Sequence, residues 1–241
     1  MPIRIAMWSG PRNISTAMMR SWGNRPDTVV IDEPLYAFYL RETGKVHPGV
    51  MEIIAKGDPN VYKILQTLTG PVPLGRRIFY QKHMTHHLLP QVDRAWLEQV
   101  TNCFLIRDPA AVIASYVKKD PSPALDDLGF VQQAEIFNWV SHRTDSAPAV
   151  IDARDILENP DKILRLLCAA VGVEFDEAML AWAPGFRDTD GIWAKYWYDE
   201  VASSTCFQPY RPKNAPLREE LREIHDRCRE CYEHLYEYRL H

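Results

Sequence analysis

The chain has 241 residues, of which 46% are hydrophobic and 25% are charged, and its formal net charge is −4. A chain of this length can bury one large core, so we expect a single domain over residues 1–241. The small negative charge argues against a general attraction to nucleic acid or to acidic membranes, so neither is an expected partner.

The cysteines are odd in number and dispersed along the chain: Cys103, Cys168, Cys206, Cys228 and Cys231. A chain of this size does not need disulfide staples, which favours a reduced, cytoplasmic protein. No apolar stretch approaches the roughly eighteen residues that a membrane span requires, and no apolar leader precedes residue 9. We therefore expect neither secretion nor membrane insertion.

The first predicted elements are a strand over residues 3–8 and a helix that begins at Ser15. The loop between them reads Ser-Gly-Pro-Arg-Asn-Ile over residues 9–14. Such a loop directs backbone amides and the positive end of a helix dipole at one place. The first 26 residues contain four arginines (Arg4, Arg12, Arg20 and Arg25) and no acid. The segment therefore predicts a site for a phosphate or a sulfate.

This loop differs from the nucleotide-binding pattern G-x-x-x-x-G-K-[ST], in which a lysine reaches the outer phosphates. Ile14 and Ser15 stand in place of the Gly-Lys pair, and Arg12 supplies a cation earlier in the loop. The missing lysine argues against an ordinary ATP-dependent kinase.

Strands and helices alternate along the rest of the chain. We expect strands at 28–31, 61–65, 76–81, 100–106 and 147–151, and helices from 36, over 110–116, through 130–140, over 160–171 and over 216–239. This order predicts an α/β fold of three layers, with a mainly parallel central sheet flanked by helices, similar to P-loop NTPases.

A second motif lies at the end of the strand at 100–106. Arg107 ends that strand, and Ser115 follows eight residues later in the next helix. This pair and the loop Pro11–Thr16 together resemble the sulfotransferase family, in which the first loop commonly reads Pro-(Lys/Arg)-Ser-Gly-Thr-Thr. In this chain Asn13 replaces the serine and Ile14 replaces the glycine. The resemblance covers residues 3 to 120 best.

The resemblance implies transfer of a sulfuryl group from 3′-phosphoadenosine-5′-phosphosulfate to a hydroxyl or amine of a small molecule, without a metal. In this interpretation the residues that hold the 5′ end of the donor are Arg12, Asn13, Ser15 and Thr16. Arg12 also supplies positive charge to the leaving phosphate. Arg107 and Ser115 would hold the 3′-phosphate. Arg211 lies where the family's C-terminal loop touches the same phosphate, although the glycines of that loop are missing here.

Two residues are candidates for the base that takes the acceptor's proton. Glu33, at the end of the strand at 28–31, resembles the glutamate that some bacterial and heparan-type family members use. His83 lies in a segment that resembles the lysine and histidine of the cytosolic members, and Lys82 before it would assist the leaving phosphate. The histidines of this segment suggest no metal site, because no fourth ligand has a suitable spacing.

Two other functions remain open. A small-molecule kinase or another P-loop nucleotide-binding protein would need magnesium, for which Asp108 is the most convenient ligand. A catalytically silent relative of the sulfotransferases would bind the donor without turning it over, as Ile14 suggests. A pyridoxal-phosphate aminotransferase is not favoured, because no segment singles out a Schiff-base lysine. The aromatic residues at 193–198 line an acceptor pocket or belong to the core.

Overall fold

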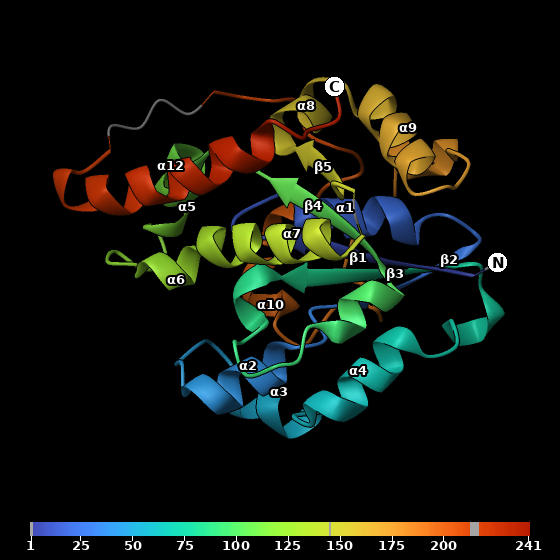
Figure 1. Cartoon of the computed structure of the whole chain (residues 1–241), viewed down its shortest axis with the longest axis horizontal. Helices are drawn as coiled ribbons and strands as arrows, with labels where there is room; N and C mark the ends of the chain where they lie inside the picture. The colour runs from blue at the N-terminus through green and yellow to red at the C-terminus, as the bar shows by residue number, and fades with distance from the viewer. Residues whose placement is uncertain (1, 145, 213–216) are drawn as a thin grey trace.

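A five-stranded parallel sheet forms the centre of the computed structural model, which describes residues 2–144, 146–212 and 217–241 (Figure 1). The strand order is β2-β3-β1-β4-β5, and every neighbouring pair is parallel. The strands are β1 (Ile3–Ser9), β2 (Thr28–Asp32), β3 (Ile78–Met84), β4 (Thr101–Ile106) and β5 (Ala149–Asp152). This confirms the expected α/β fold with a parallel sheet flanked by helices.

Helices cover both faces of the sheet because its central strands are apolar on both sides. One face packs against α1 (Ser15–Gly23), α8 (Ala153–Glu158) and α9 (Pro160–Ala170). The other face packs against α4 (Val61–Thr69), α7 (Phe130–Thr144) and α12 (Arg222–Tyr236). Within the described ranges, no helix combines the length and the apolar character needed to cross a membrane.

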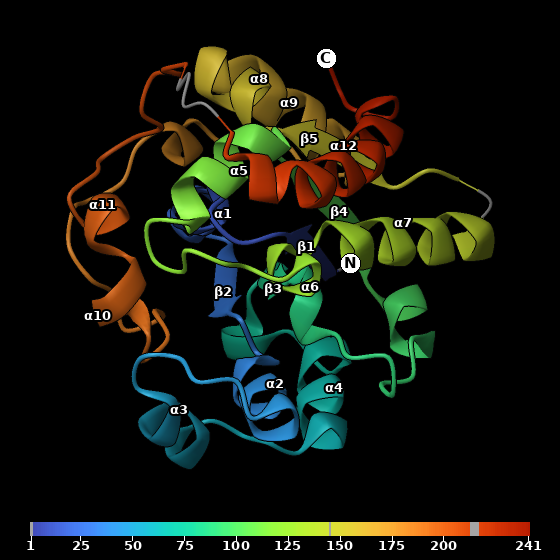
Figure 2. The same cartoon turned by 90° about the vertical axis from the view of Figure 1, so that its left-hand side faces the viewer.

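The shorter helices lie mainly around the rim of the sheet. They are α2 (Tyr36–Thr43), α3 (Val50–Lys56), α5 (Pro109–Tyr116), α6 (Leu125–Leu128), α10 (Ala194–Trp197) and α11 (Asp199–Ala202). The 3₁₀ turns are η1 (Pro73–Gly75), η2 (Thr85–His87), η3 (Ala95–Gln99), η4 (Glu177–Leu180) and η5 (Glu219–Leu221). In both views α2, α3 and α4 gather at one end of the molecule and α8 and α9 at the other (Figures 1 and 2).

The strand order determines where a ligand is expected to bind. Strand β1 lies between β3 and β4, so the connections that follow β1 and β3 leave the sheet in different directions. In parallel sheets of this kind, ligands bind outside the carboxyl ends of the strands at such a point. The loop after β1, the end of β2 and Arg107 after β4 all lie at this edge.

The predicted strand at 61–65 is wrong, because these residues begin helix α4. The Asn60 side chain accepts a hydrogen bond from the Lys63 amide and caps the helix. Ile64 and Leu68 are its buried residues, and they lie one turn apart on one face. The apolar run Val61–Leu65 therefore has a helical period that a five-residue window does not reveal.

The boundaries of several other elements differ from the prediction, and two of these differences affect candidate residues or the chain end. Strand β3 extends to Met84, so Lys82 and His83 are buried strand residues. The last helix, expected over 216–239, spans Arg222–Tyr236, and Pro216 lies outside the described residues. Cys228 is buried in this helix, and all five cysteines are free thiols, as their number and spacing suggested.

A buried ion pair connects α1 to the segment before α10, and its removal tests the packing of this region. Arg20 donates two hydrogen bonds to the Asp190 carboxylate, at 2.5 and 2.6 Å, and the two side chains are 1% and 3% exposed. Asp190→Ala leaves the Arg20 charge buried without this partner, so urea denaturation should show a loss of about 3–5 kcal/mol in the free energy of unfolding.

The control is Asp161→Ala, which removes an ion pair to Arg165 whose side chains are 49% and 52% exposed. Exposed pairs contribute about 0–1 kcal/mol, so this variant should unfold close to the wild type. Equal losses in the two variants would contradict the account.

Candidate active site

The loop between β1 and α1 is tightly constrained. A Cβ atom at Gly10 would lie 2.7 Å from the carbonyl oxygen of Leu128, so the segment before α7 packs directly over the loop. Arg12 has φ of 55°, in the left-handed region, which costs a non-glycine residue about 1–2 kcal/mol. Backbone strain of this kind often marks a ligand site.

Asn13 fixes the loop to the neighbouring strand. Its side-chain amide donates to the Leu105 carbonyl oxygen at 3.0 Å, and its side-chain oxygen accepts from the Ile14 amide at 2.8 Å. The Ile14 side chain packs against the core that α1 covers. Ile14 is therefore part of the hydrophobic packing under the loop. Ser15 is buried and Thr16 is half-buried in the first turn of α1.

The two motifs predicted as separate ends of a donor site touch each other. The Arg107 Nη1 donates to the Arg12 carbonyl oxygen at 2.7 Å, and the Arg12 Nε donates to the Ser115 Oγ at 3.0 Å. Burial and, after it, the Arg12 guanidinium lower the pKa of Arg107. Two cations gathered at one place favour binding of an anion.

Asp108, the expected magnesium ligand of a kinase, has a structural role. Its carboxylate accepts a hydrogen bond from the Ala111 amide at 2.9 Å and caps α5. The side chain therefore serves the start of this helix.

A network of buried charges lies at the ends of β2 and β3. The Lys82 Nζ donates to Asp32 at 2.9 Å, to the Glu33 Oε1 at 2.5 Å and to the Tyr198 hydroxyl at 2.8 Å. The Gly191 amide donates to the other oxygen of Asp32 at 3.0 Å. The three Lys82 donors are therefore engaged with protein groups. No motif singled out Asp32 and Tyr198 as site residues, although Asp32 precedes Glu33 and Tyr198 ends the aromatic segment.

The groups of this network shift one another's pKa values. Burial raises the pKa of Glu33, Lys82 opposes this shift, and Asp32 adds to it. Burial would lower the pKa of Lys82, but the Asp32 and Glu33 carboxylates raise it well above the usual value. Lys82 is therefore a cation at neutral pH, and Glu33 is a stronger base than an exposed glutamate.

His83 lies apart from this network. Adjacent residues of a strand point to opposite faces, and the His83 ring stacks on Trp8 with centroids 4.4 Å apart. Its Nε2 lies 3.2 Å from the Gln81 Oε1. Burial and the Lys82 charge lower its pKa to about 3. The structure brings Lys82, but not His83, together with Glu33.

The remaining predicted residues are those of the aromatic segment at 193–198 and Arg211. Trp193 and Tyr198 are buried, and the Trp193 Nε1 donates to the Tyr198 hydroxyl at 3.1 Å, so the aromatic segment belongs to the core and also supports the Lys82 network. Arg211 is exposed. Lys213 and Asn214 of the same segment lie outside the described residues.

A cavity of about 250 Å³ lies against Glu33. Its apolar lining comes from β2, the turn after β2, α2, α4 and the residue before α10, namely Ile31, Pro34, Ala37, Ile64, Leu68 and Trp193. Asp58, Lys63 and Thr67 supply polar groups. One wall is closely packed, because a Cβ at Gly57 would lie 2.4 Å from the Ala37 Cβ.

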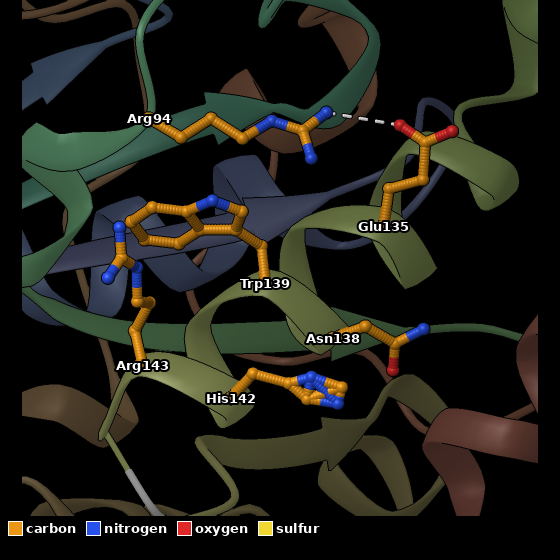
Figure 3. Close-up of a pocket in the computed structure, with 6 residues that line it drawn as sticks. All are labelled: Arg94, Glu135, Asn138, Trp139, His142 and Arg143. Atoms are coloured by element: carbon orange, nitrogen blue, oxygen red, sulfur yellow. Dashed lines mark hydrogen bonds and ion pairs between the residues drawn. The ribbon is translucent and has the colours of Figure 1, made fainter.

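A larger but shallower groove lies between Arg94, which directly precedes η3, and α7 (Figure 3). Arg94 and Glu135 form an ion pair across it at 3.1 Å, and Arg143 lies 5.5 Å from the centre of the Trp139 ring. Because η3 directly precedes β4, this groove lies near the amino end of that strand, away from the loop after β1.

Comparisons with known proteins agree with this geometry. A model of the sulfotransferase domain matches residues 3–225. The chain is 34% identical over 218 residues to the branched-chain-amino-acid aminotransferase-like protein 1 of Arabidopsis thaliana. That match covers 90% of this chain but only 39% of the relative, so the chain spans about two fifths of its length.

Two solved structures share the fold at low sequence identity. The sulfotransferase domain from the curacin biosynthetic pathway has a TM-score of 0.52 and 17% identity, and the match covers 94% of this chain and 97% of that chain. The sulfotransferase from Alicyclobacillus acidocaldarius has a TM-score of 0.52 and 11% identity, with 100% and 98% coverage. With its family match, strand order and loop after β1, the chain belongs to the sulfotransferase domain family of transferases.

Proposed function

We propose that this chain transfers a sulfuryl group from 3′-phosphoadenosine-5′-phosphosulfate to a hydroxyl or amine of a small molecule. The observation that carries the proposal is the contact of Arg12 with Ser115 and of Arg107 with the Arg12 backbone. This contact gathers two guanidinium groups, a serine hydroxyl and the start of α1 at the carboxyl edge of the sheet. A donor with phosphates at both ends of its ribose requires several such groups.

In this proposal Arg107 and Ser115 bind the 3′-phosphate, and the first turn of α1 with Ser15 and Thr16 binds the 5′-phosphosulfate. A helix N-terminus favours an anion there. Arg12 stabilises the negative charge that grows on the leaving phosphate as the sulfuryl group departs. The Arg12 hydrogen bond to Ser115 keeps this cation between the two anionic ends.

Glu33 serves as the base. Its Oε1 is held by Lys82 and Tyr198, which leaves Oε2 to take the acceptor's proton. A bond forms between the acceptor oxygen or nitrogen and sulfur, the bond from sulfur to the phosphate oxygen breaks, and the leaving phosphate keeps the electron pair. Because its three donors are engaged, Lys82 holds the base instead of reaching the leaving phosphate.

The cavity against Glu33 is the proposed acceptor site. It brings a carboxylate together with the Trp193 ring and with the apolar side chains of α4. Its volume of about 250 Å³ suits a small molecule with an apolar body, whose hydroxyl or amine points at Glu33.

The donor site can be tested by calorimetry with 3′-phosphoadenosine-5′-phosphate. We expect binding without magnesium, and we expect Arg107→Ala to weaken it by about tenfold or more, since a charged hydrogen bond contributes about 1.5–3 kcal/mol. The same variant should bind adenosine 5′-phosphosulfate, which lacks the 3′-phosphate, with a smaller loss.

The matched control is Arg143→Ala in the groove on α7, which should bind both nucleotides like the wild type. Two results would contradict the sulfotransferase proposal: equal losses for the two nucleotides, or binding that requires magnesium. A magnesium requirement would instead favour a kinase-like protein that binds another phosphorylated nucleotide.

The base can be tested with Glu33→Gln. Turnover is measured as release of 3′-phosphoadenosine-5′-phosphate from the donor in the presence of small alcohols and amines. This variant should turn over about 10²–10⁴-fold more slowly, because the proton acceptor is lost. Its affinity for the product nucleotide should stay within a factor of two or three. Glu42→Gln, on the exposed side of α2, is the control and should keep full turnover. Full turnover by Glu33→Gln would contradict the role of Glu33 as the base.

A further inference from the structure

A cluster of buried and half-buried rings lies beside Glu33 and has no role in the proposal so far. It consists of Tyr36, Tyr39, His47, His86 and His87 and is called the histidine–tyrosine cluster below. The His87 ring stacks on Tyr36 and on Tyr39, each with centroids 4.7 Å apart. The Tyr36 hydroxyl lies 2.6 Å from the His47 Nδ1. Stacking on two sides fixes the plane of the His87 ring.

One nitrogen of this fixed ring faces the proposed base. The His87 Nδ1 lies 4.0 Å from the Glu33 Oε2, the oxygen that neither Lys82 nor Tyr198 contacts. His87 is 2% exposed, and its Nδ1 has no hydrogen-bond partner in the part of the chain that the structure describes. A buried polar atom without a partner calls for an explanation.

The protonation state of His87 determines whether its Nδ1 can accept a hydrogen bond. Burial, followed by the charges of neighbouring groups, lowers its pKa well below the usual value. The groups that face it or act on its charge are Glu33, Tyr36, Tyr39, His47, Lys82, His83 and His86. His87 is therefore neutral at pH 7 and forms no ion pair with Glu33. A neutral ring with its proton on Nε2 offers the lone pair of Nδ1 as a hydrogen-bond acceptor.

We propose that His87 is a positioning residue for the base: its Nδ1 accepts a hydrogen bond from the Glu33 Oε2 once Glu33 has taken the proton of the acceptor. The proposal rests on the proposed role of Glu33. The proton leaves the acceptor, is bonded to Oε2 and stays there, so no proton moves to His87. After the product departs, Glu33 releases the proton to water.

This contact makes Glu33 a stronger base. A hydrogen bond to the protonated form of a carboxyl raises its pKa. The separation of 4.0 Å must shorten by about 1 Å to reach hydrogen-bond length. Only the Glu33 Oε2 has to move, because stacking holds the ring.

The experiment compares His87→Phe with His87→Asn. Phenylalanine keeps a ring between the tyrosines but has no acceptor, whereas asparagine places an amide oxygen near the position of Nδ1. The control is His86→Asn, which alters a half-buried histidine of the cluster that also contacts Tyr39. The pKa of Glu33 is measured by carbon NMR of protein labelled at the glutamate carboxyl, with Glu33→Gln identifying the signal.

We expect His87→Phe to lower the pKa of Glu33 by about one unit and to slow turnover about tenfold, since one unit corresponds to a tenfold change. The loss should appear in kcat and not in KM. His87→Asn should recover most of both values, and His86→Asn should leave the Glu33 pKa unchanged. If His87→Phe does not fold, His87→Gln gives the same test, because its amide reaches the position of Nε2 and leaves no acceptor at the position of Nδ1.

Two results would overturn the proposal: a Glu33 pKa that is the same in all variants, or equal changes in His87→Phe and His86→Asn. The NMR measurement does not depend on turnover. The Glu33 pKa could change with substitution of His87 although the protein releases no nucleotide product. That result would support the contact and would count against the proposed function alone.

Discussion

The buried ammonium group of Lys82 is the constraint on which the proposed site depends. The Lys82 side chain is 2% exposed, so its charge needs nearby partners. The Asp32 and Glu33 carboxylates and the Tyr198 hydroxyl supply them. These contacts join the ends of β2 and β3 to the segment that follows α10. They also hold one oxygen of Glu33, whose backbone has the left-handed φ of 40°. A single buried charge thus positions the candidate base and opposes the rise in its pKa that burial causes.

The proposed anion site depends on a different arrangement from that of nucleotide-binding P-loops. Those loops use a lysine after the second glycine, whereas here Arg12 lies within the loop and Arg107 comes from the end of β4. The Ile14 side chain, which departs from the family's glycine, packs into the core beside α1. This placement explains how the loop accepts a β-branched residue. The contact between Arg12 and Ser115 brings the two motifs together in the proposed site.

Local patterns in the sequence predicted the parallel sheet, most strands and the two motifs, because each depends on residues close together in the chain. The helix α4 was missed because Val61–Leu65 is too short a run to separate a strand from a helix, and its cap at Asn60 was not recognised. The Lys82 network could not be predicted. Lys82 and Tyr198 are 49 to 166 residues away from the two carboxylates that they contact. Only the pairing of β2 with β3 and the return of the chain at residues 191–198 bring these groups together. The position of His87 beside Glu33 depends on the same pairing.

The most direct test of the central claim is a crystal structure with 3′-phosphoadenosine-5′-phosphate bound. We expect the 3′-phosphate to lie within hydrogen-bond distance of Arg107 and Ser115. The 5′-phosphate should lie at the first turn of α1 beside Arg12. The Glu33 Oε2 should face the space beyond the 5′-phosphate where sulfur would lie. A nucleotide bound in the reverse direction, or bound away from the loop after β1, would contradict the account.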